Sequence, residues 1–322
     1  MSRPAPFTLE GKRVFVAGHR GMVGAALVRR LAREDCTVLT VPRADLDLRN
    51  RDAVAGWMHA QRPDAVMVAA ARVGGIHANS TYPADFLYDN LAIATATIDA
   101  AHRTGVAKLL YLGSSCIYPR LADQPIREDA LLTGPLEPTN EWYAVAKIAG
   151  IKLCDSYRLQ HGADFISCMP PNLYGPNDNF HPMNSHVLAA LMRRIHEAKV
   201  QGLDTVTVWG TGRPRREFMH VDDLADACVF LLRHYSEAGV INAGTGEEIS
   251  IGDLARTIAA AVGWTGRLVF DPSKPDGMPR KILDAGRLAA LGWRHRIGLR
   301  EGIEDSYRWF LAQGPDGGAV RT

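Results

Sequence analysis

The chain has few cysteines among its 322 residues, and they form no CxxC pair. The five cysteines are Cys36, Cys116, Cys154, Cys168 and Cys228. An odd number of scattered cysteines in a chain of this length argues against a disulfide framework and against a structural zinc site. We therefore expect reduced thiols, no bound metal and a cytoplasmic protein.

Long apolar runs and an excess of one charge are also missing. No stretch of about 18 uncharged apolar residues is present, so we expect no transmembrane helix, and the first residues lack the apolar segment of a signal peptide. Lys and Arg total 37 and Asp and Glu total 35, for a formal net charge of +2. This balance gives no electrostatic reason to expect a nucleic acid or a membrane as partner.

Short apolar segments alternate with helical patterns through the first half of the chain. Strands are expected at residues 12–17, 37–41, 65–70, 108–112 and 166–169. Strands that are apolar throughout and are separated by helices are typical of a parallel sheet covered on both faces. We predict an α/β fold with a doubly wound parallel sheet, the Rossmann arrangement.

The pattern changes after residue 169, where four prolines fall within residues 170–182. We predict a dinucleotide-binding domain of residues 1–173, to which residues 217–243 return. Residues 174–216 and 244–322 are expected to form a smaller C-terminal region that binds the substrate.

A glycine-rich loop, GHRGMVG, follows the first expected strand and opens the first helix. Glycines permit a tight turn and a close approach of the backbone to a pyrophosphate, and the start of a helix offers free N–H groups. The spacing is GxxGxxG, and its place in a strand–helix–strand unit favours a dinucleotide site. The loop residues expected at the cofactor are Gly18, His19, Arg20, Gly21, Met22, Val23 and Gly24.

The end of the second strand indicates which dinucleotide is bound. An NAD site usually has Asp or Glu there, to hold the 2′-hydroxyl of the ribose. Here the strand is followed by Arg43, which suits a 2′-phosphate, and Arg20 is a second candidate for that phosphate. We predict NADP(H), while Asp45 and Asp47 keep NAD open as the alternative.

Tyr143 and Lys147 form a Tyr-x-x-x-Lys motif, and on a helix they share one face. A lysine ammonium beside a phenol favours the phenolate, so Tyr143 is expected to exchange a proton near neutral pH. Ser114 follows the fourth strand, at the edge of the sheet where ligands bind. We expect Ser114 to hydrogen-bond the same substrate oxygen as Tyr143, and the three residues together indicate a catalytic site.

The chain resembles the extended short-chain dehydrogenase/reductases, and within them the GDP-L-fucose synthase family. The blocks that carry this resemblance are GHRGMVG (18–24), AAARVGGI (69–76), NSTYPADF (79–86), LGSSCIYP (112–119), EPTNEWYAVAKIAGIKLC (137–154), NLYGPNDNFHPMNSHV (172–187), REFMHVDD (216–223) and KPDGMPRK (274–281). Two positions depart from the family, which has Thr where this chain has Pro171 and often Pro where it has Trp142. Pro171 removes a backbone N–H and a hydroxyl beside the expected nicotinamide site.

The resemblance implies NADPH-dependent conversion of GDP-4-keto-6-deoxy-D-mannose to GDP-L-fucose. Carbons 3 and 5 are epimerised first, and hydride then reduces the 4-keto group. Epimerisation needs a base and an acid on opposite faces of the sugar, and the resemblance assigns Cys116 as the base and His186 as the acid. His181, five residues earlier in the same loop, is the competitor of His186.

The resemblance also implies the remaining contacts. Further cofactor contacts are expected from Arg43, Asp45, Leu46, Leu112, Gly113, Ser114, Ser115, Tyr143, Lys147, Pro170, Asn172, Leu173 and His186. The GDP-sugar is expected to meet Arg194, Trp209, Arg216 and Asp276, with Lys281 near the nucleotide. A homodimer is expected through the helices near residues 89–104 and 143–160.

Three alternatives remain open on the sequence. The first is a nucleotide-sugar 4-epimerase or 4,6-dehydratase, which recycles a tightly held NAD. The second is a reductase for another GDP-linked deoxy sugar on the same scaffold. The third is a non-catalytic NADP-binding protein, since a fold alone does not imply catalysis; the intact Ser114, Tyr143 and Lys147 argue against it.

Overall fold

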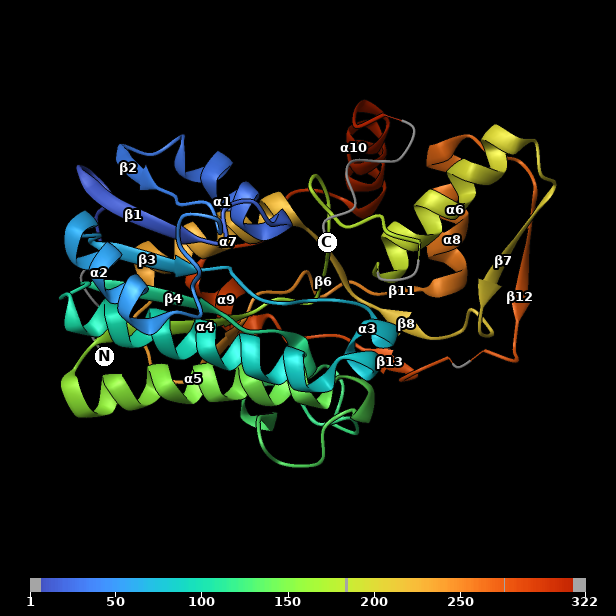
Figure 1. The fold of residues 1–322 in the computed structure, drawn as a ribbon. Coiled ribbons are helices and arrows are strands. Elements are labelled where there is room, and N and C mark those ends of the chain that lie inside the picture. The colour runs from blue at the N-terminus through green and yellow to red at the C-terminus, as the bar shows by residue number, and fades with distance from the viewer. Residues whose placement is uncertain (1–6, 183–184, 275, 315–322) are drawn as a thin grey trace.

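The main sheet of the computed structural model is parallel throughout. The structure describes residues 7–182, 185–274 and 276–314, and within them six strands pair in the order β10-β5-β4-β3-β1-β2 (Figure 1). These strands are β1 (Lys12–Ala17), β2 (Cys36–Leu39), β3 (Ala65–Val68), β4 (Lys108–Leu112), β5 (Asp164–Met169) and β10 (Val240–Asn242). The predicted doubly wound parallel sheet is confirmed.

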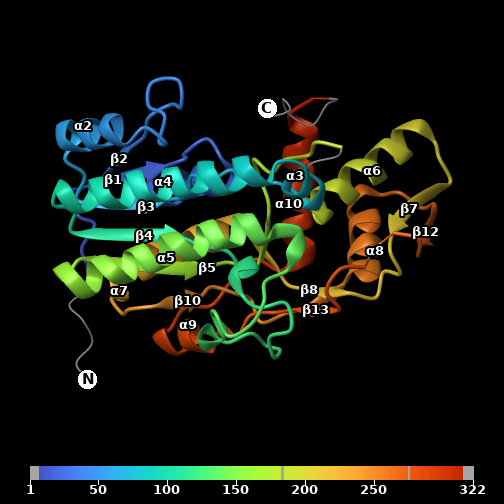
Figure 2. The same ribbon diagram turned by 60° about the horizontal axis from the view of Figure 1, so that its bottom comes forward.

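Helices cover both faces of this sheet, as Figure 2 shows. One face carries α1 (Met22–Leu31) and α7 (Val221–His234), and the other carries α2 (Arg51–Gln61), α4 (Pro83–Arg103) and α5 (Glu141–His161). Successive side chains of a strand point to opposite faces. Val14 and Val16 therefore enter the core beneath α1 and α7, whereas Phe15 and Ala17 enter the core beneath the other three helices.

The predicted element ranges are close to those observed. The ranges 12–17 and 108–112 match β1 and β4, whereas β2 ends at Leu39, two residues before the predicted end. The chain turns soon afterwards, because the N–H groups of Asp45 and Leu46 both donate to the carbonyl oxygen of Pro42. This turn places Arg43 just beyond the edge strand.

A second core lies beyond one end of the main sheet (Figures 1 and 2). It packs α6 (Val187–Gln201), α8 (Ile251–Val262) and α10 (Leu299–Ala312) against the paired strands β7 (Thr205–Trp209) and β12 (Arg267–Asp271). The remaining elements that the structure gives are α3 (Ile76–Thr81), η1 (Ser115–Ile117), η2 (Glu128–Ala130), η3 (Pro138–Asn140), β6 (Asn172–Tyr174), β8 (Arg215–Arg216), β9 (Phe218–His220), β11 (Ile249–Ser250), β13 (Arg280–Lys281) and α9 (Gly286–Leu291).

Short pairings join the two cores. β6 pairs with β9, and β8 lies between β11 and β13 in a small sheet. Leu288 of α9 and Trp293, both late in the chain, pack into the core beneath α1 and α7. Among the residues that the structure describes, no helix is both long and apolar enough to cross a bilayer.

Candidate active site

The glycine-rich loop lies where the strand order of the main sheet reverses, between β1 and β3. Gly18 has a φ of 88°, and a Cβ there would lie 2.7 Å from the Cα of Ala70. A Cβ on Gly24 would lie 2.0 Å from the carbonyl oxygen of Gly18. Larger residues cannot fit at these two positions, so glycine lets the loop pack tightly against Ala70 and the start of α1. This cradle and the helix N-terminus fit the pyrophosphate of a dinucleotide.

Arginines lie at the ribose end of the same edge. Arg43 is exposed in the turn after β2, and Arg20 is exposed in the glycine-rich loop. Asp47, which had kept the NAD alternative open, forms an ion pair with Arg49 at 2.6 Å, and Arg49 lowers the pKa of Asp47 to about 2. Arg43 and Arg20 are exposed and stay the predicted partners of a 2′-phosphate.

One predicted cofactor residue points elsewhere. Leu46 was expected at the cofactor, yet its side chain is 5% exposed and packs into the core beneath α2 and α4. The turn that follows β2 folds this apolar side chain under the sheet, while Asp45, one residue earlier, is exposed. A cofactor contact at Leu46, which stays a prediction, would therefore be made by its main chain.

The segments after β4 and β5 are fastened to each other. The N–H of Gly113 donates to the carbonyl oxygen of Cys168 at 2.9 Å, and the N–H of Ser115 donates to that of Pro170 at 3.0 Å. A Cβ on Gly113 would lie 2.3 Å from the sulfur of Met169. The predicted cofactor residues of these two segments therefore lie side by side at one edge of the sheet.

β6 continues this edge. The side-chain amide of Asn172 donates to the carbonyl oxygen of Glu217 at 2.9 Å, which ties β6 to β9. Leu173 packs against the core beneath α1 and α7. Asn172 thereby holds the strand that leads from the main sheet to the second core.

Tyr143 and Lys147 share one face of α5, as their spacing predicted. The Nζ of Lys147 donates to the carbonyl oxygen of Leu112 at 2.7 Å and lies 5.8 Å from the centre of the Tyr143 ring. Burial lowers the pKa of Lys147 to about 7.

The surroundings of Tyr143 do not favour the phenolate that the motif predicts. Burial raises the pKa of its phenol, the nearby Cys116 raises it further, and a hydrogen bond with Ser114 acts in the opposite direction. A buried phenolate is poorly solvated, and the ammonium of Lys147 is directed to Leu112 instead. These surroundings favour the protonated phenol of Tyr143, which is able to donate a proton.

Cys116 lies in the short helix η1, where its N–H donates to the Oγ of Ser114 at 3.2 Å. Its sulfur accepts a hydrogen bond from the Nζ of Lys281 at 3.4 Å. The resemblance placed Lys281 near the nucleotide, but β13 brings it to the cysteine. Ser114, Cys116, Tyr143 and Lys281 therefore gather at one place.

His186 directly precedes α6 and caps its N-terminus through the backbone. The residue is exposed as a whole, yet burial of its imidazole by the surrounding protein and, to a smaller extent, the charge of Lys281 lower its pKa. This link to Lys281 joins His186 to the cluster around Cys116. The N–H of its sequence competitor, His181, donates to the side chain of Asn179.

Residues expected at the GDP-sugar gather in the second region. Trp209 ends β7 and is 56% exposed, with the guanidinium of Arg194 at 5.6 Å and the ammonium of Lys274 at 5.9 Å from its ring centre. Arg194 also donates to the carbonyl oxygen of Thr207 at 2.8 Å. An exposed ring with two cations nearby suits a flat, anionic ligand.

Two further residues predicted to bind the substrate, Arg216 and Asp276, also interact with other parts of the protein. Arg216, expected in a loop, belongs to β8, where burial lowers the pKa of its guanidinium and Asp276 acts against that shift. The carboxylate of Asp276 accepts hydrogen bonds from the N–H and the hydroxyl of Thr211, at 2.6 and 2.8 Å. Asp276 therefore orders the loop that follows Trp209.

Sequence reasoning missed two residues here. Lys274 was not assigned, although it lies in the quoted block 274–281 and stacks on Trp209. Glu217, in the block 216–223, is fully buried and accepts hydrogen bonds from the N–H groups of Thr245, Gly246 and Leu283. The one sequence signal for either residue is that it lies in a segment that carries the family resemblance.

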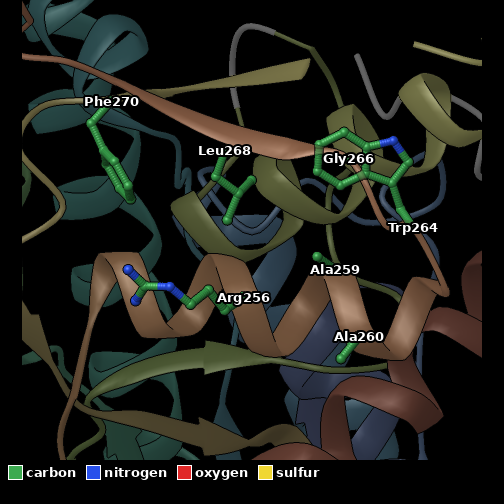
Figure 3. A pocket seen from close by; sticks show the side chains of 7 residues that line it. All are labelled: Arg256, Ala259, Ala260, Trp264, Gly266, Leu268 and Phe270. Carbon is green, nitrogen blue, oxygen red and sulfur yellow. The ribbon is translucent and has the colours of Figure 1, made fainter. Parts of the chain in front are cut away.

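A separate pocket of about 390 Å³ opens between α8 and β12 (Figure 3). Its lining consists of Arg256, Ala259, Ala260, Trp264, Gly266, Leu268 and Phe270. None of these belongs to the predicted site, and Arg256 forms an ion pair with Asp253. Within the described ranges, no group of three or more His, Cys, Asp or Glu side chains is placed to hold a metal ion.

Known proteins resemble this chain over most of its length. Residues 14–247 match the NAD dependent epimerase/dehydratase family. GDP-L-fucose synthase 1 of Arabidopsis thaliana is 59% identical over 300 residues, covering 93% of this chain and 93% of that protein. GDP-L-fucose synthase of Escherichia coli (strain K12) is 55% identical over 310 residues, covering 93% of this chain and 97% of that protein.

A solved structure agrees with these relatives. The GDP-L-fucose synthetase of Naegleria fowleri bound to NADP superposes with a TM-score of 0.88 at 30% identity, covering 96% of this chain and 97% of that one. The glycine cradle and the Ser114, Tyr143 and Lys147 set lie within the range that matches the family. The chain therefore belongs to the NAD dependent epimerase/dehydratase family, within the group of the GDP-L-fucose synthases.

Proposed function

We propose that this enzyme converts GDP-4-keto-6-deoxy-D-mannose to GDP-L-fucose, by epimerisation at carbons 3 and 5 and NADPH-dependent reduction of the 4-keto group. One observation carries the proposal: the N–H of Cys116 donates to the Oγ of Ser114 at 3.2 Å, and the Ser114 side chain also hydrogen-bonds the phenol of Tyr143. A candidate base for epimerisation and a candidate proton donor for reduction therefore share one site. A simple reductase needs only the second.

In the epimerisation, Cys116 is the base and His186 the acid. The 4-keto group acidifies the hydrogens on carbons 3 and 5, so a thiolate can remove a proton from either carbon. His186 then delivers a proton to the opposite face. Its lowered pKa makes its protonated form a stronger acid, although less of that form is present at neutral pH.

In the reduction, Tyr143 donates a proton to the 4-keto oxygen, and Ser114 hydrogen-bonds the same oxygen. NADPH, when bound, supplies the hydride to carbon 4. The raised pKa of Tyr143 keeps its phenol protonated until that step. Lys147 positions Tyr143 by holding α5 against the end of β4.

The cofactor is held along the carboxyl edge of the main sheet. The cradle of residues 18–24 and the N-terminus of α1 take the pyrophosphate, and Arg43 and Arg20 take the 2′-phosphate. Residues 112–115, Pro170 and Asn172 line the nicotinamide end. Residues 1–173 with 217–243 form this domain.

Residues 174–216 and 244–322 form the region that binds the GDP-sugar. Trp209 and Arg194 face the nucleotide, and Arg216 faces the diphosphate, while Asp276 orders their loop. The enzyme works in the cytoplasm as a homodimer, through the exposed faces of α4 and α5. Exposed apolar side chains on those helices, among them Tyr88 and Trp142, support this interface.

Consumption of NADPH with GDP-4-keto-6-deoxy-D-mannose, followed by identification of the product sugar, tests the proposal. Stoichiometric oxidation that yields GDP-L-fucose is the expected result. Oxidation that yields GDP-rhamnose would mean a plain 4-reductase and would remove Cys116 and His186 from catalysis. Absence of oxidation would refute the substrate.

A further inference from the structure

The contact between Lys281 and Cys116 joins residues that are far apart in the chain. The Nζ of Lys281 lies 3.4 Å from the sulfur of Cys116, and both side chains are half-buried. Water competes less for a half-buried ammonium than for an exposed one, so its effect on a neighbouring thiol is stronger. The pair therefore has the geometry of an ammonium donating to sulfur.

Charged and titratable groups reach this pair from several elements. α5 contributes Tyr143, whose surroundings favour the protonated phenol, and β13 contributes Lys281. Arg216 of β8 is the register partner of Lys281 in a parallel pairing, so the two side chains lie on the same face of the small sheet. His186, before α6, lies within range of the Lys281 charge. Of these groups, Lys281 is the one whose ammonium contacts the Cys116 sulfur.

We propose that Lys281 is a catalytic residue of the epimerisation, whose ammonium group donates to the Cys116 sulfur and stabilises the thiolate that removes the substrate proton. This inference rests on the proposed function and names one further residue of the same site. It differs from the nucleotide contact that the resemblance implied for Lys281.

The proton balance keeps Lys281 outside the transfer. The C–H bond at carbon 3 or 5 breaks and an S–H bond forms on Cys116, while the electron pair moves to the 4-keto oxygen as an enolate. His186 then gives its N–H proton to the carbon from the opposite face, and the ketone forms again. Lys281 retains its protons and supplies the positive charge.

The ammonium of Lys281 acts on both the proposed base, Cys116, and the proposed acid, His186. It donates a hydrogen bond to the sulfur of Cys116, and it lowers the pKa of His186, which weakens the hold of the imidazole on its proton. On this proposal, one lysine assists both the base, Cys116, and the acid, His186.

Glu217 positions Lys281. The N–H of Glu217 donates to the carbonyl oxygen of Lys281 at 3.3 Å, and its buried carboxyl group accepts from the N–H of Leu283 at 2.8 Å. The other carboxyl oxygen accepts from Thr245 and Gly246, at 2.6 and 3.0 Å. Because Glu217 is fully buried, these bonds hold β13 in place against β8.

Alkylation of Cys116 by iodoacetamide, followed by mass spectrometry across a pH series, tests the pair without substrate or cofactor. The thiolate is the reactive form, so the rate reports its fraction. In Lys281→Met, alkylation near pH 7 should slow about tenfold and the profile should move to higher pH, since a close opposite charge has been removed. Lys281→Arg should restore most of the rate.

Arg280→Met is the matched control, since Arg280 is the neighbouring residue on β13 but pairs with Glu248 at 2.7 Å. It also removes one positive charge, and the Cys116 profile should stay that of the wild type. Cys116→Ser identifies any label on the other cysteines. Equal alkylation rates in Lys281→Met and wild type at every pH would overturn the proposal.

The substrate assay separates this role from nucleotide binding. Lys281→Met should slow exchange of the carbon 3 and carbon 5 protons with D₂O at saturating GDP-sugar. A raised KM with unchanged alkylation and unchanged exchange at saturation would assign Lys281 to the nucleotide and refute the proposal. In another outcome, the alkylation profile of Lys281→Met shifts while the wild-type enzyme fails to turn over the keto-sugar. That result would support the Lys281–Cys116 pair and would refute only the proposed substrate.

Discussion

Lys147 donates a hydrogen bond of 2.7 Å to the main-chain oxygen of Leu112, which joins α5 to the end of β4. The rings of Tyr111 and Tyr143 lie 4.9 and 5.8 Å from the same nitrogen. A carbonyl dipole and two aromatic faces compensate only part of the cost of burying a cation. Burial therefore lowers the pKa of Lys147 to about 7, and its charge changes near neutral pH.

Lys147→Met should change how stability depends on pH. The folded pKa of about 7 lies below the ordinary lysine value of 10.5, so between these values the unfolded chain holds more protons than the folded chain. Wild-type stability therefore gains as pH rises through this window, and the variant lacks that gain. Urea unfolding should show the variant's relative stability falling from about pH 7 to about pH 9.5. A pH-independent difference would mean that Lys147 titrates normally.

Tyr143→Phe should remove reduction and leave epimerisation. Loss of the proton donor should slow NADPH oxidation by about 10²- to 10⁴-fold, the usual contribution of a general acid. Exchange of carbon-bound protons with D₂O should continue, because Cys116 and His186 are intact. Tyr235→Phe, at a tyrosine after α7 that lies outside the site, is the control. Reduction at the wild-type rate would contradict the role of Tyr143.

Cys116→Ser should slow proton exchange at carbons 3 and 5, again by about 10²-fold or more, because a hydroxyl is a far weaker acid than a thiol. Mass spectrometry of the recovered GDP-sugar measures the exchange. NADPH binding should be unchanged. Cys36→Ser, at a partly buried thiol of β2, is the matched control. Undiminished exchange in Cys116→Ser would assign the base to another group.

Arg43→Ala should weaken NADPH binding by about 10- to 100-fold, the effect of one charge-assisted hydrogen bond. NADH binding should change little, because NADH has no 2′-phosphate. Arg51→Ala is the control, since Arg51 is an exposed arginine of α2 that pairs with Asp99 at 3.0 Å. Titrations followed by nicotinamide fluorescence give both affinities. An equal loss for the two cofactors would show that Arg43 does not distinguish them.

Glu217→Gln separates positioning from charge. The carboxyl oxygens of Glu217 now accept hydrogen bonds from main-chain N–H groups. The NH₂ group of a glutamine would point a second donor at one of these N–H groups, and so would displace Leu283 or Thr245. Lys281 should move from Cys116, and alkylation of the thiol near pH 7 should slow. Removal of a negative charge alone would favour the thiolate and accelerate alkylation. Faster or unchanged alkylation would therefore contradict the positioning role.

Local patterns were sufficient for the sheet and for the cradle. Val14, Val16, Phe15 and Ala17 are apolar on both faces of one strand, which only a sheet covered on both sides can bury. The spacing of Tyr143 and Lys147 placed them on one helical face, because the period of a helix is a property of the local backbone. Family resemblance added Cys116 and His186, which spacing alone could not distinguish from structural residues.

Burial and long-range contacts decided what the side chains can do. Desolvation works against the phenolate predicted for Tyr143, and the solvation of a side chain depends on everything packed around it. Lys281 meets Cys116 only because β13 pairs with β8 and Glu217 holds that pairing. Motifs and helical periods are local and can be read along the chain. Desolvation and contacts across 165 residues exist only once the chain is folded.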